Sequence, residues 1–163
     1  AASAALVEVG DSTREAYDAK ANGLPIADLI RAEIMLAQAQ HEQALTITTE
    51  VVASLGTMGI QPFLADVLWF QGQALLGLGR ADEARQALLA AHQQAQKLQA
   101  RRCWWRILAT FKELEAAQGH REEASALHRQ AREIVYFIAD HAGTPQRRAC
   151  FLGQPDVRAL LDG

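Results

Sequence analysis

The hexapeptide GRADEA at residues 79–84 recurs as GHREEA at residues 119–124 and, with more substitutions, as AQHEQA at residues 39–44. The alanine that ends each stretch stands 40 residues from the next one. Self-similarity at a fixed period of roughly 20 to 50 residues is typical of repeat proteins. The sequence therefore predicts a series of similar structural units. The alanines that mark the phase are Ala44, Ala84 and Ala124.

The residues on either side of GRADEA indicate what one unit contains. Apolar residues recur at helical spacing within residues 63–78 and again within residues 84–98. Gly79 suits the end of the first helix, because glycine takes the left-handed conformation without a Cβ penalty. Asp82 and Glu83 suit the start of the second, because acidic side chains stabilise the positive end of the helix dipole. Each unit is therefore predicted to be a helix, a tight turn and a second helix.

Extended over the chain, this period predicts an all-α protein of stacked antiparallel helix pairs, forming one domain over residues 1–163. We expect a partial unit before the first full pair, with its remaining helix at residues 11–22. A capping helix within residues 145–163 is expected to cover the last apolar surface. The three full pairs are predicted at residues 25–60, 63–100 and 101–142.

The second unit resembles the tetratricopeptide-repeat family. The period is longer than the roughly 34 residues usual in that family. It is similar to the long-helix variant in the C-terminal sensor regions of bacterial LuxR-type regulators and cyclase-linked signalling ATPases. The resemblance implies a right-handed α-solenoid whose first helices line a concave side, and Lys112 departs from it by replacing a small residue. The matching positions are Leu68, Gly72, Leu75, Gly79, Ala84, Leu88 and Ala91.

The ends of the chain suggest that it is a piece of a longer protein. It opens on Ala1 rather than on methionine, and residues 145–163 resemble the final segment of such repeat arrays. Two cysteines, Cys103 and Cys150, stand outside any metal-binding spacing. We expect reduced thiols in a cytoplasmic protein, although the sequence leaves a disulfide between them open.

Charge and hydropathy narrow the classes of partner. The net charge is −3, so the chain lacks the basic excess of a nucleic-acid-binding domain. No apolar run approaches the roughly 18 residues of a membrane span. Nothing at the N-terminus resembles a signal peptide, because no basic residues precede the apolar stretch. We therefore expect neither a membrane nor a nucleic acid as partner.

A search for catalytic motifs finds none. There is no phosphate-binding glycine loop and no His-Glu-x-x-His pattern. The five histidines are dispersed, and the carboxylates of Glu113 and Glu115 point to different sides of their predicted helix. We expect no enzyme, no cofactor and no metal site.

The densest aromatic and basic cluster is RRCWWR at residues 101–106. Its guanidinium groups and indole rings could bind an anionic or aromatic ligand. Alternatively, a tryptophan packs on the neighbouring unit while the arginine stems cover it and their charges face water. We favour the packing interpretation.

The other candidate surface is the concave side that the resemblance implies. Stepping by three and four along each predicted first helix selects a stripe of mixed chemistry. Trp69 stands out there, because a tryptophan with polar neighbours is typical of a binding hot spot; the alternative is that it packs against the adjacent unit. The candidate binding residues are Leu29, Glu33, Asp66, Trp69, Gln73, Arg106 and Glu113.

Two functions fit this pattern. In the first, the chain is a protein–protein interaction module, the C-terminal regulatory region of a bacterial signalling or transcription-regulatory protein. Its concave side would then bind a peptide or another domain of the same parent chain. In the second, it is a small-ligand sensor that gates an attached ATPase, cyclase or DNA-binding domain. Pairing of two copies through an apolar N-terminal face is a further option.

Overall fold

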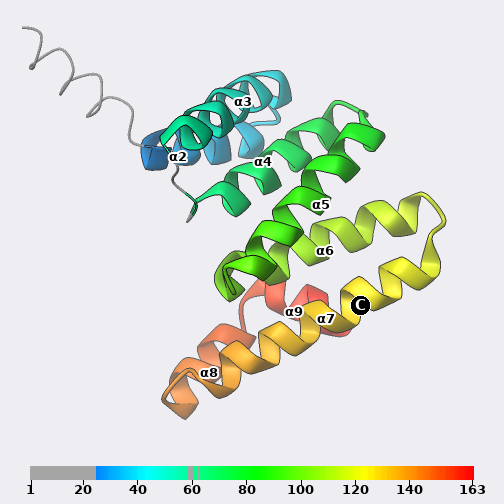
Figure 1. The fold of residues 1–163 in the computed structure, drawn as a ribbon. Helices are drawn as coiled ribbons and strands as arrows, with labels where there is room; N and C mark the ends of the chain where they lie inside the picture. The colour runs from blue at the N-terminus through cyan, green and yellow to red at the C-terminus, as the bar shows by residue number, and fades with distance from the viewer. Residues whose placement is uncertain (1–24, 59–60, 62) are drawn as a thin grey trace, which may run out of the picture.

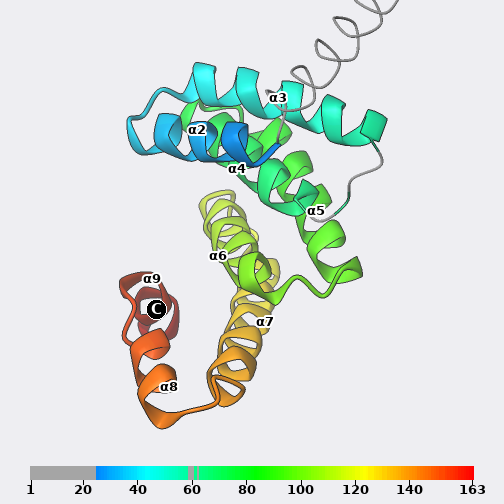
Figure 2. The ribbon, with the colours of Figure 1, turned by 90° about the vertical axis from the view of Figure 1, so that its left-hand side faces the viewer.

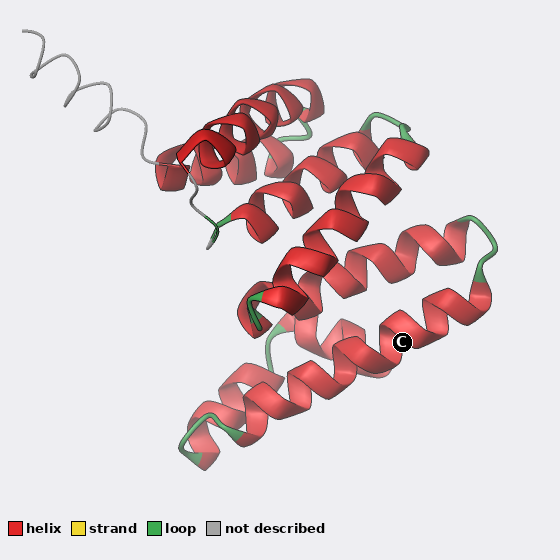
Figure 3. Ribbon diagram, viewed as in Figure 1, coloured by secondary structure: helices red, strands yellow, loops and turns green. Residues whose placement is uncertain are grey.

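The computed structural model describes residues 25–58, 61 and 63–163, and all regular structure in this part of the chain is helical (Figure 1, Figure 3). The prediction of an all-α protein is confirmed there. The helix predicted at residues 11–22 lies outside the described residues. The helices are α2 (Pro25–Ala37), α3 (His41–Met58), α4 (Leu64–Gly77), α5 (Ala81–Lys97), α6 (Arg101–Ala117), α7 (Arg121–Asp140), α8 (Pro145–Leu152) and α9 (Pro155–Asp162).

The turns inside the three helix pairs have the same backbone geometry. After α4, Gly79 N–H donates to the carbonyl of Leu76 at 3.0 Å, and Arg80 N–H donates to that of Leu75 at 2.9 Å. These two bonds form the Schellman motif, which requires a left-handed residue after the helix. The same bonds recur 40 residues earlier and 40 residues later. The left-handed residues are Ala39 (φ 56°), Gly79 (φ 73°) and Gly119 (φ 86°).

Small residues allow the two helices of each pair to pack closely. Ala44, Ala84 and Ala124 are all buried at the start of the second helix of their pair. Inside the second pair, a Cβ added to Gly72 would stand 2.8 Å from the Leu88 side chain. A larger residue at these positions would hold the helices apart. The 40-residue phase in the sequence is therefore a record of close helix packing.

The core runs along the chain of helices. Each helix packs mainly on its neighbours in sequence, and the helices follow one another in a curve (Figure 2). Leu114 of α6, for example, packs against Ala84, Ala87 and Leu88 of α5, the preceding pair. Apolar burial of this kind is the main stabilising term of the fold.

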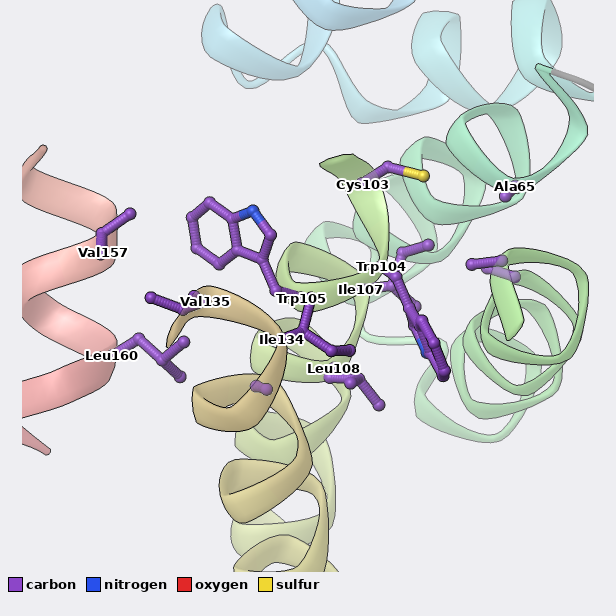
Figure 4. Close-up of a cluster of buried hydrophobic side chains, with 13 residues drawn as sticks. Ala65, Cys103, Trp104, Trp105, Ile107, Leu108, Ile134, Val135, Val157 and Leu160 are labelled. Atoms are coloured by element: carbon purple, nitrogen blue, oxygen red, sulfur yellow. The ribbon is translucent and has the colours of Figure 1, made fainter. Parts of the chain in front are cut away.

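The C-terminal segment forms two short helices, α8 and α9, where the sequence predicted one capping helix. Thr144 caps α8 by accepting a hydrogen bond from Arg147 N–H, and Pro155 opens α9. Gly153 and Gln154 separate the two helices. Val157 and Leu160 of α9 are buried and face α6 and α7 (Figure 4).

Two sequence expectations concern chemistry outside the core. Cys103 is buried and Cys150 exposed, and both thiols are free, so the disulfide that the sequence left open is not formed. Burial raises the pKa of the Cys103 thiol to about 12. None of the described helices has the length and hydropathy needed to cross a bilayer.

Candidate functional site

A cavity of about 370 Å³ lies where α2, α4, α6 and α9 meet. It forms because the chain doubles back after α7 and brings α9 beside α6 (Figure 2). Several lining residues, including Glu33, Glu113 and Asp156, are exposed, so the cavity is open to solvent. Its lining residues are Glu33, Trp69, Trp105, Arg106, Ala109, Thr110, Lys112, Glu113, Asp156, Ala159 and Leu160.

Trp69 is half-buried and held by hydrogen bonds to the next pair. Its indole N–H donates to the Thr110 hydroxyl at 2.9 Å, and that hydroxyl donates to the Arg106 carbonyl at 3.1 Å. Its ring stacks on Phe70, with 5.1 Å between the ring centroids. Trp69 thus packs against the adjacent unit and also lines the cavity, so both interpretations that the sequence left open describe part of its environment.

Arg106 is fixed at one end of the cavity. Its guanidinium carbon lies 5.0 Å from the centroid of the Trp105 ring, a cation–π contact. Its Nη2 lies 3.9 Å from the Asp156 carboxylate of α9, and the side chain is 37% exposed. The Arg106 Nε atom is buried without a hydrogen-bond partner among the described residues.

Charges of both signs line the rest of the cavity. Glu33 of α2 and Glu113 of α6 are exposed and make no hydrogen bond or ion pair with the described residues. Lys112 is half-buried, and its charge contributes to a lowered pKa of His128, after the larger effect of burial. With Asp156 and Arg106, the lining holds three carboxylates and two cations.

Four of the seven residues chosen from the sequence line this cavity: Glu33, Trp69, Arg106 and Glu113. The other three lie elsewhere. Leu29 packs on the apolar cluster of α3 and α4, and Gln73 is half-buried outside the lining. Asp66 is 3% exposed, and both of its carboxylate oxygens accept hydrogen bonds from Arg102, so it is a structural ion pair rather than part of the groove.

The RRCWWR cluster is mainly a packing element. Trp104 and Trp105 are buried and point to different sides of α6, toward α5 and α9 respectively (Figure 4). The Trp104 indole N–H donates to His92 Nδ1 at 2.9 Å, and burial lowers the pKa of His92. Arg101 lies over the Phe137 ring at 4.2 Å. Only Trp105 and Arg106 reach the cavity.

Some lining residues were missed in the sequence. Lys112 could have been found, because it replaces a small packing residue of the repeat. Asp156 and Leu160 could not, because their place depends on how α9 folds back onto α6. Thr110 gives no signal until its bond with Trp69 is seen.

A buried ion network near the cavity also escaped the sequence analysis. Glu115 is 1% exposed, and its carboxylate accepts a hydrogen bond from Arg85 Nε at 2.7 Å. The other carboxylate oxygen lies 2.5 Å from His120 Nδ1. The network joins α5, α6 and the turn before α7 and does not face the cavity. As expected, Glu113 and Glu115 point to different sides of their helix.

What the cavity offers chemically is an aromatic surface with charged side chains around it. The described residues contain no group of three His, Cys, Asp or Glu side chains that could hold a metal ion. No protein-family model, curated protein or solved structure matches the chain.

Proposed function

We propose that the chain is a right-handed α-solenoid similar to tetratricopeptide-repeat proteins and that it binds a protein or peptide partner. Three observations support the architecture: the 40-residue phase, the identical turns and the packing of each helix on its sequence neighbours. Repeat stacks of this kind provide extended concave binding surfaces. The proposal is for a binding module rather than an enzyme.

The observation that carries this proposal is the convergence of Glu33, Trp69, Arg106 and Glu113 on one open cavity. They come from three different helices that are separate in sequence. A tryptophan and an arginine with polar neighbours are the residues that most often dominate binding energy. Hydrogen bonding holds Trp69 before a partner arrives, which lowers the entropic cost of binding.

The wider setting is proposed from the sequence resemblance. In it, the chain is the cytoplasmic C-terminal regulatory region of a bacterial signalling or transcription-regulatory protein, and its partner is a protein or another domain of the same parent. A second candidate is a sensor for a small ligand that gates an attached ATPase, cyclase or DNA-binding domain. The cavity volume of about 370 Å³ favours that alternative, because small-molecule pockets begin at about 300 Å³.

Peptide selection from a random dodecapeptide phage library tests the interaction proposal. We expect an enriched consensus whose synthetic peptide binds the chain and loses at least tenfold in affinity for Trp69→Ala. Leu89→Ala is the matched control, because Leu89 is exposed on α5 away from the cavity. Circular dichroism and the Tm of each variant separate lost contacts from lost folding. No enrichment, or equal binding by Trp69→Ala, would contradict the proposal.

The sensor alternative makes a different prediction. A metabolite that fills the cavity would raise the Tm of the chain by mass action, and Trp69→Ala would abolish that rise. A thermal-shift screen of small metabolites measures this directly. A saturable shift with no selected peptide would favour the sensor over the interaction module.

A further inference from the structure

The cations and the carboxylates of the cavity differ in how they are engaged. Arg106 stacks on Trp105 and lies near Asp156. The Lys112 Nζ lies 4.0 Å from the position that a Cβ would take on Gly163, and the Lys112 charge acts on His128. The ammonium group is therefore directed toward the end of α9 and toward α7. Both cations are held by their surroundings.

The two carboxylates at the mouth are not engaged in this way. Glu33 and Glu113 belong to different helices and make no ion pair with the described residues, although they line the same cavity. Their charge is therefore the part that a partner can neutralise. Unpaired charge at the rim of a binding surface selects a partner of opposite sign and accelerates its association.

Trp69 supplies the second feature of the site. Its N–H is used by Thr110, so the indole offers a partner its apolar surface rather than a hydrogen-bond donor. The face of an indole ring carries negative partial charge and attracts cations. Lysine and arginine combine an apolar stem with a cationic end, which suits a ring beside carboxylates.

We propose that the groove binds a basic peptide segment, with the stem of one lysine or arginine on the Trp69 ring and its cationic group held by Glu33 and Glu113. This inference rests on the proposed peptide-binding function and adds the chemistry of the partner. Charge complementarity decides between basic and acidic partners, because the engaged cations Arg106 and Lys112 leave a negative mouth.

Three fluorescein-labelled nonapeptides test the proposal by fluorescence anisotropy. In each, alanine alternates with lysine, with glutamine or with glutamate. We expect the lysine peptide to bind roughly tenfold or more tightly than the other two, with an affinity that falls as salt rises. The double variant Glu33→Gln/Glu113→Gln should lose roughly tenfold or more in affinity for the lysine peptide.

The matched control is Glu50→Gln/Glu123→Gln, which removes the same two charges from exposed positions outside the cavity. It should bind the lysine peptide as the unmodified chain does. Equal loss in both double variants would reduce the effect to net charge and overturn the proposal. Failure of the lysine peptide to bind at 1 mM would overturn it too.

The outcomes also separate this inference from the proposed function. If the glutamate or glutamine peptide binds best and Trp69→Ala abolishes that binding, the groove binds peptides but the basic partner is wrong. If neither these peptides nor any phage-selected peptide depends on Trp69, both proposals fail.

Discussion

The second and third helix pairs share one backbone plan but differ at three equivalent packing positions. In the second pair (α4 and α5) these positions hold a compact, apolar contact. In the third pair (α6 and α7) they hold groups that carry or accept charge, of which the carboxylate is fully buried. Gly72, Leu75 and Leu88 of the second pair correspond to Lys112, Glu115 and His128 of the third.

This difference teaches where to look for a site in a repeat protein. Most of the cavity lining comes from α6, the first helix of the third pair. The second pair contributes only Trp69, which bonds to Thr110 of α6. Departures from the apolar repeat therefore accompany the candidate groove, while the regular pair supplies the packing that positions it.

The largest expected effect tests whether the second pair is the packing unit. Leu88 is fully buried, so Leu88→Ala should lower the free energy of unfolding by about 3 kcal/mol. His128 at the equivalent place is half-buried, and His128→Ala should cost less than about 1 kcal/mol. Urea unfolding of both variants measures the contrast. Equal losses would show that the two pairs depend on this position alike.

The second prediction converts one position of the third pair into that of the second. Glu115→Ala leaves Arg85 and His120 without their buried partner and should cost about 2 kcal/mol, reduced because both cations are half-exposed. Glu115→Leu restores the apolar residue of the second pair and should recover most of that stability. Chemical denaturation compares the two. A leucine variant as unstable as the alanine variant would make the carboxylate itself indispensable.

A smaller effect is expected at the closest approach of the helices. In Gly72→Ala the new Cβ would stand 2.8 Å from Leu88, so the crowding should outweigh the gain in helix propensity by about 1 kcal/mol. The matched change Lys112→Ala should leave stability unchanged or slightly raised, because no close contact opposes it there. Thermal unfolding of the two variants decides. A stabilised Gly72→Ala variant would show that α4 and α5 can move apart freely.

The smallest effect concerns the joint between the two pairs, where His92 accepts the Trp104 N–H. Burial lowers the pKa of His92 in the folded chain, so the unfolded chain binds this proton at higher pH. Stability should therefore fall as the pH drops below about 6.5, the ordinary histidine value. The Tm of the chain between pH 7.5 and pH 5 measures it.

The control for that pH dependence is His92→Gln, which should flatten the fall of Tm in the acid range. His128, whose pKa is also lowered, should account for part of the remaining slope. An unchanged slope in His92→Gln would remove the joint from the explanation.

The sequence predicted the helix pairs because their determinants are local. Gly79 and Gly119 end a helix through their own backbone conformation, and the buried alanines keep their phase wherever two helices pack closely. Four lining residues were also predicted, because the residues on one face of a helix follow from its period.

The remaining features depend on contacts between distant segments. Asp66 was placed in the groove by periodicity, but Arg102 of the next pair binds it in a buried position. Asp156 reaches the cavity only because the tail forms two helices that fold back. Local spacing carries no information on such pairings, which are decided by packing and charge across the stack.

The most direct test of the central claim is the nitrogen–hydrogen NMR spectrum of the chain with the lysine nonapeptide. The chain has three indole signals, and Trp69→Phe identifies the one from the groove. We predict that the peptide shifts the Trp69 signal and the backbone signals of Thr110 and Glu113, while the buried Trp104 signal stays in place. Shifts confined to the exposed side of α7, with Trp69 unmoved, would contradict the account.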